Sequence, residues 1–536
     1  MVFQNDILAG ASGTGFSYQI DQSIRFNDDD SAYLSDTLGT ATDTDVYTVS
    51  AWVKRGNLGL LNYIFSAGPV STTSEDFIGF QANDTIFARW AGTTRLATTQ
   101  VFRDPSSWYH IVLACDYGAA GSAKAQLYVN GVEITAFTTD TRSSITTTNQ
   151  RWNTATLHYF GRNAPAGAQY LDGYLSEINF IDGQQLAPTD FGETNDDGVW
   201  VPKAYAGTYG TNGFYITGAD SADLGADYSG NGNDFTSSGL TSDDQVADTP
   251  TDNYPTYNSI STLGTLSDGN LVLSIQDYAC PITQSYPTSG IWQTDFELDV
   301  VSGSNGAGVG VLDYSLFKYR TNDGSYTDGS LTWGGSYGFG ADGTLNSPSA
   351  YNVAYGSNWF TAGNIISIIY NADVGAVWFA VNGTLQNSAT GAEIESGITT
   401  NAAFTGLSSA VYTPFTWSHN SANSMILLNE TQQSISGLTS AKLLSTANLT
   451  DSTITTSGSF TGNVNTNGPF VFLNGVPTAM TINGNAVTFG TDADKLANGF
   501  KVRSSSSSYN SSGTNTFVVS ATDGSFADNV TAQINP

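Results

Sequence analysis

Three widely separated stretches share one pattern of apolar and polar positions: an alternating apolar strand, an Asn-Gly pair and a second short strand. They are AQLYVNGVEI (125–134), AVWFAVNGTLQ (376–386) and FVFLNGVPTAMTINGNAVTF (470–489). Asn-Gly favours the two-residue type I′ turn because both central residues need positive φ, and flanking apolar alternation makes it a strong hairpin signal. One hairpin near the end of each third of the chain predicts three antiparallel modules in series. Such modules more often bind or build than catalyse.

Length and composition extend this prediction to the whole chain. At 536 residues the chain exceeds a single core, since domains average roughly 150 residues. Gly, Ser, Thr and Asn are abundant while charged residues make up only 12%, a profile typical of short strands joined by tight polar turns. Aromatic residues reach 12% and provide enough apolar surface to fill several cores. We therefore predict an all-β globular protein.

The net charge of −31, from 48 acidic and 17 basic residues, excludes binding to a nucleic-acid backbone. An acidic surface that is poor in lysine fits a protein that works outside a cytosol. The sequence has no apolar run of 18 residues, so we expect no membrane insertion. Residues 1–20 lack the charged start and apolar core of a signal peptide, so we expect no export by the ordinary secretory route.

The strand order of the first third is specific. SAWVKRG is followed by a strand ending in FSAG, then by WYHIVLACD, the LYVNG hairpin, FGRN and GYLSEINFIDG. This succession resembles concanavalin A-like domains of the laminin-G type. The resemblance implies a two-sheet jelly roll in which the first strand and the last strand, 171–182, pair side by side. Four residues at apolar alternating positions are expected in the core: Trp52, Phe65, Trp108 and Leu175.

Residues 192–258 read as a connector with one strand, GFYI, and with Trp200, Tyr209 and Tyr215 packed on the first sandwich. The run from GYLSEINFIDGQQLAPTDFGE through GVWVPKAYAGTYGTNGFYI to DYSGNGNDFT and DTPTDN is similar to a segment found in virion-associated proteins of tailed phages, especially marine ones. This resemblance implies a virion protein.

The remaining chain predicts two more sandwiches. WQTDFELDVVSG, GNIISI and the VNG turn resemble a SPRY-type β-sandwich, with Asn364 where that pattern usually has Asp. About seven short strands after residue 430 fit an immunoglobulin-like sandwich. The predicted fold is thus a tandem of antiparallel β-sandwiches: a jelly roll (1–191), the connector (192–258), a SPRY-type sandwich (259–430) and an immunoglobulin-like sandwich (431–536).

Catalytic chemistry has little support in the sequence. Each histidine lies in or beside an aromatic strand, which favours a structural role for His110, His158 and His419. Glycoside hydrolysis needs two nearby carboxylates, and jelly rolls do host such enzymes. The glutamates Glu133, Glu177 and Glu297 stand singly, whereas Glu393 and Glu395 are expected in a loop, GAEIESG. We predict that the protein is not an enzyme.

One segment could bind a metal ion. Asp227, Ser229 and Asn231, followed by Gly232, match the oxygen ligands and turn glycine that open a calcium loop. Ser238 stands where a bidentate Glu is expected, so an Asx-rich turn without an ion is the alternative. No cofactor is required by this prediction, and calcium is the candidate ion.

Ligand contacts are expected from aromatic residues in polar loops. The longest such loop, 318–360, is rich in Tyr, Gly, Ser and Asn, a composition that gives contact area at low entropy cost. Its candidate ligand-binding residues are Tyr319, Tyr326, Tyr351 and Tyr355. A second candidate group next to turns of the first module is Trp90, Arg95 and Trp152.

These observations predict a virion fibre or spike of a tailed phage, most simply a homotrimer, on the tail or capsid surface. Its expected partners are other virion proteins and a glycan or protein of the host cell surface, bound by many weak contacts multiplied by valency. The main alternative is a structural head fibre or decoration protein. A polysaccharide depolymerase is a third hypothesis, disfavoured because no β-helix repeats are visible.

Overall fold

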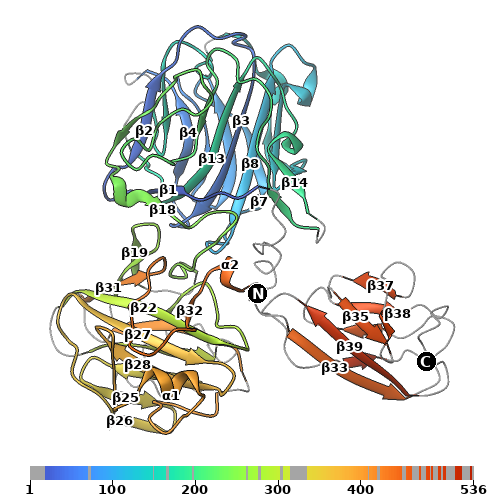
Figure 1. The fold of residues 1–536 in the computed structure, drawn as a ribbon. Helices are drawn as coiled ribbons and strands as arrows, with labels where there is room; N and C mark the ends of the chain where they lie inside the picture. The colour runs from blue at the N-terminus through green and yellow to red at the C-terminus, as the bar shows by residue number, and fades with distance from the viewer. Residues whose placement is uncertain are drawn as a thin grey trace.

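The computed structural model describes residues 18–69, 74–148, 150–164, 168–195, 198–260, 264–275, 279–301, 306–313, 335–407, 410–418 and 423–449. Beyond residue 449 it describes the strands β33 to β40 alone. Figure 1 shows three groups of antiparallel strands along the chain. The described residues are almost entirely β-structure, which confirms the predicted fold class.

Two sheets form the first sandwich (Figure 1). One has the order β10 (Val132–Glu133), β9 (Ala125–Val129), β8 (Trp108–Asp116), β3 (Val46–Arg55), β13 (Gly173–Asp182), β1 (Ser23–Phe26) and β18 (Gln245–Val246), with β16 (Phe214–Ile216) also paired to β13. The other has the order β11 (Phe137–Asp140), β7 (Thr93–Val101), β6 (Thr85–Trp90), β5 (Asp76–Phe80), β4 (Asn62–Ala67), β12 (Leu157–Phe160), β2 (Tyr33–Thr37) and β17 (Thr236–Ser238). Ile24 of β1 pairs with Leu175 of β13, so the expected pairing of first and last strands is confirmed.

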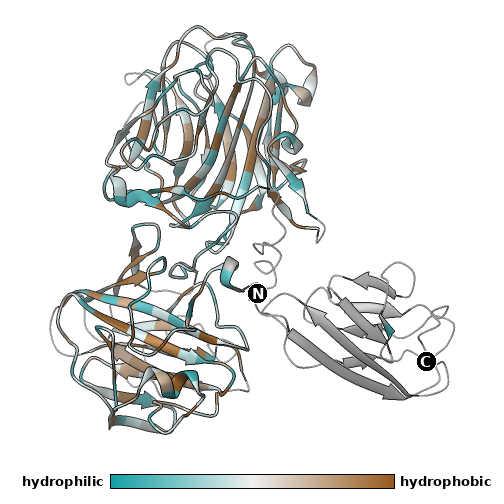
Figure 2. Cartoon of the chain, viewed as in Figure 1, coloured by the Kyte–Doolittle hydropathy of each residue, from teal (hydrophilic) through white to brown (hydrophobic). Residues whose placement is uncertain are grey.

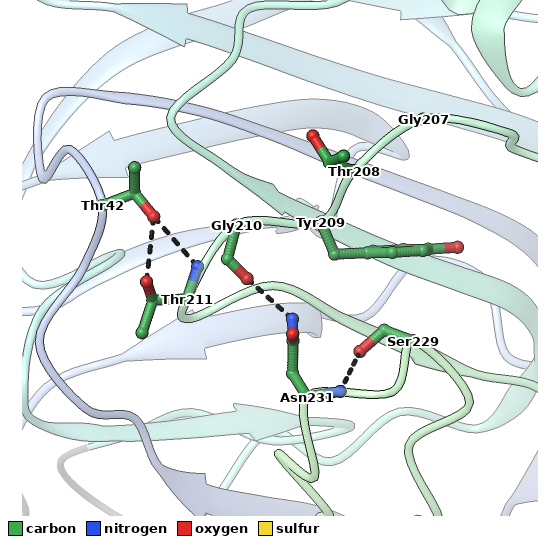
Figure 3. Close-up of a pocket in the computed structure, with 8 residues that line it drawn as sticks. All are labelled: Thr42, Gly207, Thr208, Tyr209, Gly210, Thr211, Ser229 and Asn231. Carbon is green, nitrogen blue, oxygen red and sulfur yellow. Dashed lines mark hydrogen bonds between the residues drawn. The ribbon is translucent and has the colours of Figure 1, made fainter.

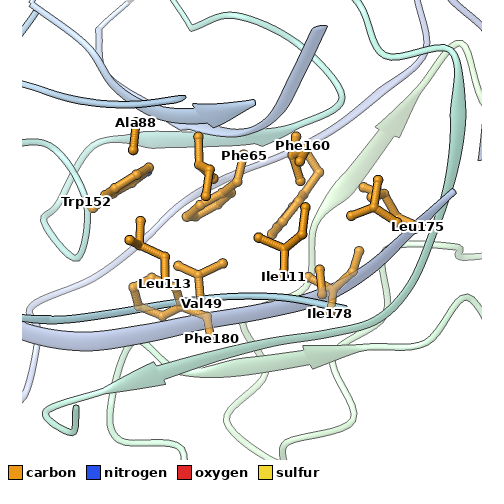
Figure 4. Packing of buried hydrophobic residues seen from close by; sticks show 14 of the residues in the cluster. Val49, Phe65, Ala88, Ile111, Leu113, Trp152, Phe160, Leu175, Ile178 and Phe180 are labelled. Carbon is orange, nitrogen blue, oxygen red and sulfur yellow. The ribbon is translucent and has the colours of Figure 1, made fainter. Parts of the chain in front are cut away.

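The core of this sandwich comes from the inward positions of both sheets. Figure 4 shows Val49, Leu113 and Phe180 from one sheet facing Phe65 and other side chains across the interior. Apolar positions recur along these strands between polar ones (Figure 2), as a half-buried sheet requires. A large apolar side chain that is fully buried contributes about 1.5–3 kcal/mol to stability.

The connector is built into the first sandwich. The predicted strand GFYI forms β16, with Ile216 opposite Ile178 of β13. Four further strands were not predicted: β14 (Gly192–Thr194), β15 (Trp200–Pro202), β17 and β18. Of these, β17 lies beside β2, and β18 pairs with β1. Strands β14 and β15 form a small hairpin that precedes the other two. The connector therefore widens both sheets.

The second sandwich also has two sheets. The first has the order β19 (Thr265–Ser267), β20 (Val272–Ile275), β31 (Asn423–Leu428), β22 (Ile291–Val300), β27 (Asn364–Asn371), β28 (Ala376–Val381) and β29 (Thr384–Leu385), with β32 (Lys442–Leu443) parallel to β22. The second has the order β21 (Ala279–Pro281), β30 (Tyr412–Ser418), β23 (Ala307–Asp313), β24 (Ser336–Gly340), β25 (Thr344–Ser347) and β26 (Ala350–Ala354). Short helices α1 (Gly391–Glu395) and α2 (Thr446–Leu449) follow. Trp359, Trp378 and Phe379 are fully buried here.

Two four-stranded sheets make up the C-terminal module. They have the orders β33 (Ile454–Thr461), β39 (Thr514–Ala521), β35 (Ala479–Ile482), β36 (Asn485–Ala486) and β37 (Ala493–Leu496), β38 (Gly499–Val502), β34 (Phe470–Phe472), β40 (Thr531–Gln533). The Asn-Gly pair at 474–475, predicted as a hairpin turn, lies outside the described residues, and the strands before and after it, β34 and β35, lie in different sheets. The pair at 483–484 lies instead between β35 and β36, which do form a hairpin.

A buried joint connects the first and second sandwiches. Gly269, in the β19–β20 turn, donates its N–H to Asp172 Oδ1 at 2.8 Å and accepts from the Tyr174 hydroxyl at 2.8 Å. Asn270 Nδ2 donates to the carbonyl of Gly56 at 3.0 Å. These contacts come from both strands of the β3–β13 pair, at the end that faces the second sandwich. The two sandwiches are thus held together by specific backbone and side-chain hydrogen bonds.

Candidate functional site

A depression of about 650 Å³ lies at the rim of the first sandwich, beside the end of β13. Thr42 reaches it from the loop between β2 and β3, and the other side chains come from the segments on either side of β16. Figure 3 shows the residues that line this rim depression: Thr42, Gly207, Thr208, Tyr209, Gly210, Thr211, Ser229 and Asn231. None carries a charge. The lining combines hydroxyls, an amide, an aromatic ring and glycine backbone.

Asp182, the last residue of β13, fixes the wall behind Thr42. Its carboxylate is 2% exposed and accepts from the N–H groups of Thr42 (2.6 Å), Asp43 (3.2 Å) and Asn212 (3.0 Å) and from Asn153 Nδ2 (2.8 Å). Burial by itself would raise the pKa of Asp182, but these hydrogen bonds outweigh it and lower the pKa. The ionised carboxylate therefore holds two loops of the rim in place.

Asp227 fixes the opposite wall through a closed hydrogen-bond network. Its Oδ1 accepts from the N–H groups of Tyr215 and Ser229, both at 2.8 Å, and its Oδ2 accepts from Ser229 Oγ (2.8 Å) and from the Asn233 N–H (3.0 Å). Asn231 Nδ2 donates to the Gly210 and Gly213 carbonyls at 2.7 and 2.8 Å. The three residues predicted as calcium ligands thus form an Asx-rich turn in which the Asp227 oxygens and Ser229 Oγ accept from protein donors and the Asn231 amide donates to backbone carbonyls.

No group of three or more His, Cys, Asp or Glu side chains with metal-binding geometry exists in the described part of the chain. At the rim the four donors to Asp227 occupy the lone pairs that a calcium ion would need. The hydrogen-bonded turn, the alternative considered from the sequence, accounts for the geometry of this loop.

Tyr209 supplies the aromatic surface of the rim depression. Its hydroxyl donates to Asn179 Oδ1 at 3.0 Å, and its ring stacks on Tyr215 with centroids 6.2 Å apart. Tyr215 in turn donates to Glu177 at 2.8 Å. Burial, followed by the nearby Glu177 carboxylate, raises the pKa of Tyr209 well above its ordinary value, so the phenol stays neutral. The ring is held at a fixed angle beside Thr208 and Ser229 (Figure 3).

Glu177 lies behind Tyr209 in an unusual conformation. Its φ is +50°, at a register shift in β13, and its carboxylate also accepts from the Tyr18 hydroxyl at 3.0 Å. Burial raises the pKa of Glu177, and the hydrogen bonds from Tyr215 and Tyr18 oppose this shift. The bulge turns the carboxylate toward the tyrosines that support the rim.

The match to a family model decides the class of the first sandwich. Residues 26–188 match the model described as the concanavalin A-like lectin/glucanases superfamily. This part of the chain is a concanavalin A-like domain. No curated protein matches the chain.

Several solved structures are similar to parts of the chain. The SPRY domain of human HERC1 has 16% sequence identity, a TM-score of 0.24, and coverage of 32% of this chain and 96% of that one. A putative carbohydrate binding protein from Bacteroides ovatus has 16% identity, a TM-score of 0.30, and coverage of 42% of this chain and 60% of that one. A SAP-like pentraxin from Limulus polyphemus has 14% identity, a TM-score of 0.24, and coverage of 31% of this chain and 78% of that one.

Two predicted ligand-binding residues lie inside the concanavalin A-like domain, which corrects their assignment. Trp90 and Trp152 are 2% and 0% exposed, and their rings meet edge to face at 5.6 Å in the core. Trp90 Nε1 donates to the Tyr47 hydroxyl at 3.1 Å. Arg95, on β7, is half-buried. Turn proximity in the sequence did not reveal that both indoles point inward from their segments.

The predicted tyrosine loop is also largely regular structure. Residues 336–354 contain strands β24, β25 and β26, so the expectation of one long loop over 318–360 is wrong for this part. Tyr351 is 52% exposed on β26, whereas Tyr355 is half-buried and packs edge to face on Phe339 and Phe379. Tyr319 and Tyr326 lie outside the described residues. Neither Tyr351 nor Tyr355 lines the rim depression.

The glutamates that could have formed a hydrolase pair serve other purposes. Glu393 and Glu395 lie in α1 and not in the expected loop. Glu393 accepts from the N–H of Thr390 at 2.8 Å as part of a capping box, and Glu395 accepts from the Ser440 N–H at 2.7 Å. Both carboxylates thus stabilise local structure.

Sequence reasoning missed the residues that close the rim depression. Thr42, Thr208 and Thr211 carry no motif, and Tyr209 was expected only to pack on the sandwich. One signal was available in AGTYGTNG, where glycines flank an aromatic residue. Gly210 has a φ of +75°, and a Cβ there would lie 2.2 Å from the carbonyl oxygen of Asp182. Only glycine allows this turn to approach β13 so closely.

Proposed function

We propose that the protein binds carbohydrate through the rim depression of its concanavalin A-like domain. The supporting observation is the lining itself: hydroxyls and an amide, which can donate and accept hydrogen bonds to sugar hydroxyls, surround the neutral ring of Tyr209. The description of the matching family, lectin/glucanases, agrees with this ligand class. We propose binding without catalysis, because three of the glutamates, Glu177, Glu393 and Glu395, are each engaged in hydrogen bonds within the protein.

We further propose that this binding attaches a tailed-phage particle to its host, with the protein as a homotrimeric fibre or spike. The resemblance of 173–253 to virion-associated proteins supports the lineage. Strand β13 separates the rim depression from the second sandwich. Asp172, just before its first residue, contacts Gly269 of the second sandwich, whereas Asp182 at its other end supports the rim depression. Ten residues at about 3.3 Å each separate the two sites by roughly 30 Å. The depression thus lies at the end of β13 opposite to the joint with the second sandwich.

The test measures binding of the fluorescently labelled protein to candidate host cells and its competition with adsorption of intact particles. We expect saturable binding that blocks adsorption, and we expect Tyr209→Ala to reduce it at least tenfold, on the order of the loss of one aromatic contact. The exposed Tyr228, replaced in the same way, serves as the control. A folded protein that binds no host cell would refute attachment and favour a structural role in decorating the particle.

A further inference from the structure

We propose that the rim depression selects uncharged saccharides and rejects anionic ones. This inference rests on the proposed carbohydrate-binding function and adds the class of sugar. Its first support is the lining, in which none of the eight residues is Lys, Arg or His. Recognition of a sugar carboxylate or sulfate ordinarily relies on cationic side chains or converging N–H groups. Among the lining residues, the N–H groups of Thr42 and Ser229 already donate to protein carboxylates, and those of Thr211 and Asn231 donate to protein hydroxyls.

Two carboxylates lie directly behind the lining. Asp182 is 2.6 Å from the Thr42 N–H, and Asp227 is 2.8 Å from Ser229 Oγ. The hydrogen bonds that lower the pKa of Asp182 keep it ionised. Within the described residues, no salt bridge neutralises either of them. The local field at the depression is therefore negative, and the net charge of −31 adds to it.

One of these carboxylates, Asp227, orients the hydroxyl of Ser229. Ser229 Oγ donates its proton to Asp227 and accepts from the Asn231 N–H at 3.2 Å. Thr42 Oγ1 accepts from the Thr211 N–H at 2.9 Å. Ser229 therefore presents lone pairs, not a proton, to the depression. An acceptor-rich wall suits the O–H donors of a neutral sugar and repels the oxygens of a carboxylate or sulfate.

The test compares matched saccharides that differ in charge. Galacto-oligosaccharides and oligogalacturonates of equal length are titrated into the full chain by calorimetry, and mannan and mannuronate oligosaccharides form a second pair. We expect the neutral member to bind at least about tenfold more tightly, since like charges a few ångströms apart cost on the order of 1 kcal/mol or more. Equal or tighter binding of the anionic members would overturn the selectivity and leave carbohydrate binding intact.

Two variants assign the effect to the rim depression. Thr208 is an exposed lining residue, and Thr208→Lys places a cation there. We expect this variant to bind the anionic saccharides about tenfold more tightly than the wild type, whereas the uncharged Thr208→Gln should not. An identical response of the two variants would contradict the electrostatic argument. Loss of neutral-saccharide binding in Tyr209→Ala, with an unchanged unfolding temperature, supports the rim depression as the binding site. If the folded wild-type chain binds no member of either pair, the proposed function itself fails.

Discussion

Lys54 and Asp248 form an ion pair that water does not reach. Both side chains are 0% exposed, with Nζ 2.6 Å from Oδ2. Nζ also donates to Asn253 Oδ1 at 2.8 Å and to the Tyr254 carbonyl at 2.7 Å, while Asp248 Oδ1 accepts from Trp108 Nε1 at 3.1 Å. Burial lowers the pKa of Lys54 and raises that of Asp248, and their attraction opposes both shifts. Every strong donor and acceptor of the pair is thus engaged.

Removing one partner of this pair should destabilise the protein strongly. We expect Lys54→Met to lower the free energy of unfolding by about 3–5 kcal/mol, because it leaves the Asp248 carboxylate buried without a cation. Chemical denaturation followed by tryptophan fluorescence measures this loss, since Trp108 contacts the pair. The double variant Lys54→Met/Asp248→Leu is the control and should recover much of it. A loss below about 1 kcal/mol in the single variant would contradict the argument.

Asp182 should matter for binding as well as for stability. We expect Asp182→Asn to cost about 1–3 kcal/mol, because an amide replaces one acceptor oxygen among four donors and leaves buried N–H groups unpaired. Saccharide binding should weaken together with the stability, because the Thr42 loop loses the carboxylate that holds it in place. Calorimetric titration and thermal unfolding measure the two effects. Asp223→Asn, at an exposed position, is the matched control and should change neither.

Single residues were predictable where alternation alone decides their position. Trp52, Phe65, Trp108 and Leu175 are all buried, as their strand positions indicated. Trp152 lies outside any strand, so no periodicity marked it as a core residue. The rim residues were less predictable still. Four hydrogen bonds to the carboxylate of Asp182 bring them together, and no pattern of side chains marks them.

At the scale of elements, the β9–β10 hairpin permits a clean test of a turn glycine. Asn130 and Gly131 have φ angles of +48° and +77°, the type I′ geometry that the sequence predicted. A Cβ on Gly131 would lie 2.4 Å from the Trp200 ring, which stacks on His110 and donates to its Nδ1 at 3.0 Å. Gly121 has a similar φ of +60° but no atom within 4 Å of such a Cβ.

Gly131→Ala should therefore destabilise more than Gly121→Ala. Both carry the cost of an alanine at positive φ, on the order of 1 kcal/mol. The first variant must also displace Trp200, and we expect an additional loss of about 1–3 kcal/mol. Thermal unfolding of both variants gives the difference directly. Equal losses would mean that the Trp200 ring moves aside without cost.

Elements with strong local signals were predictable, and those defined by long-range pairing were not. The turns at 130–131 and at 382–383, where φ is +49° and +75°, formed as expected. Strand β34, before the Asn-Gly pair at 474–475, pairs with β38 and β40 and not with β35, the next strand along the chain. Helix α1 was missed because its five residues are too few for a periodic pattern, and a capping box defines it.

At the scale of the whole molecule, the order of the sandwiches followed from the sequence, but their joint did not. Asp172 and Gly269 are 97 residues apart, and Gly56 and Asn270 are 214 apart, so no local pattern relates them. Strands β16, β17 and β18 have two or three residues each, too short for alternation to identify all of them. The described helices are also too short and too polar to span a bilayer.

Asp172 gives this joint a pH dependence. It is 1% exposed, its Oδ1 accepts from the Gly269 N–H, and its Oδ2 is buried without a hydrogen-bond partner. Two carboxylates, Asp28 and Asp268, face it, and Arg25 is paired with Asp268 at 3.1 Å. Burial, and then the negative charge of Asp28, raise the pKa of Asp172 from 3.8 to about 7. The ionised form is thus disfavoured in the closed joint.

The joint should consequently loosen as the pH rises toward 7. The folded state binds the Asp172 proton more tightly than the unfolded state, so the stabilisation is complete below pH 3.8 and is lost as the pH passes the folded pKa of about 7. We expect the free energy of opening to fall by about 1 kcal/mol per pH unit in this window. Hydrogen exchange of the Gly269 amide, corrected for its intrinsic pH dependence, measures it. Asp172→Asn keeps the Oδ1 acceptor without the charge and should remove the dependence, whereas Asp223→Asn should retain it. A pH profile that is the same in Asp172→Asn and in the wild type would show that another group controls the joint.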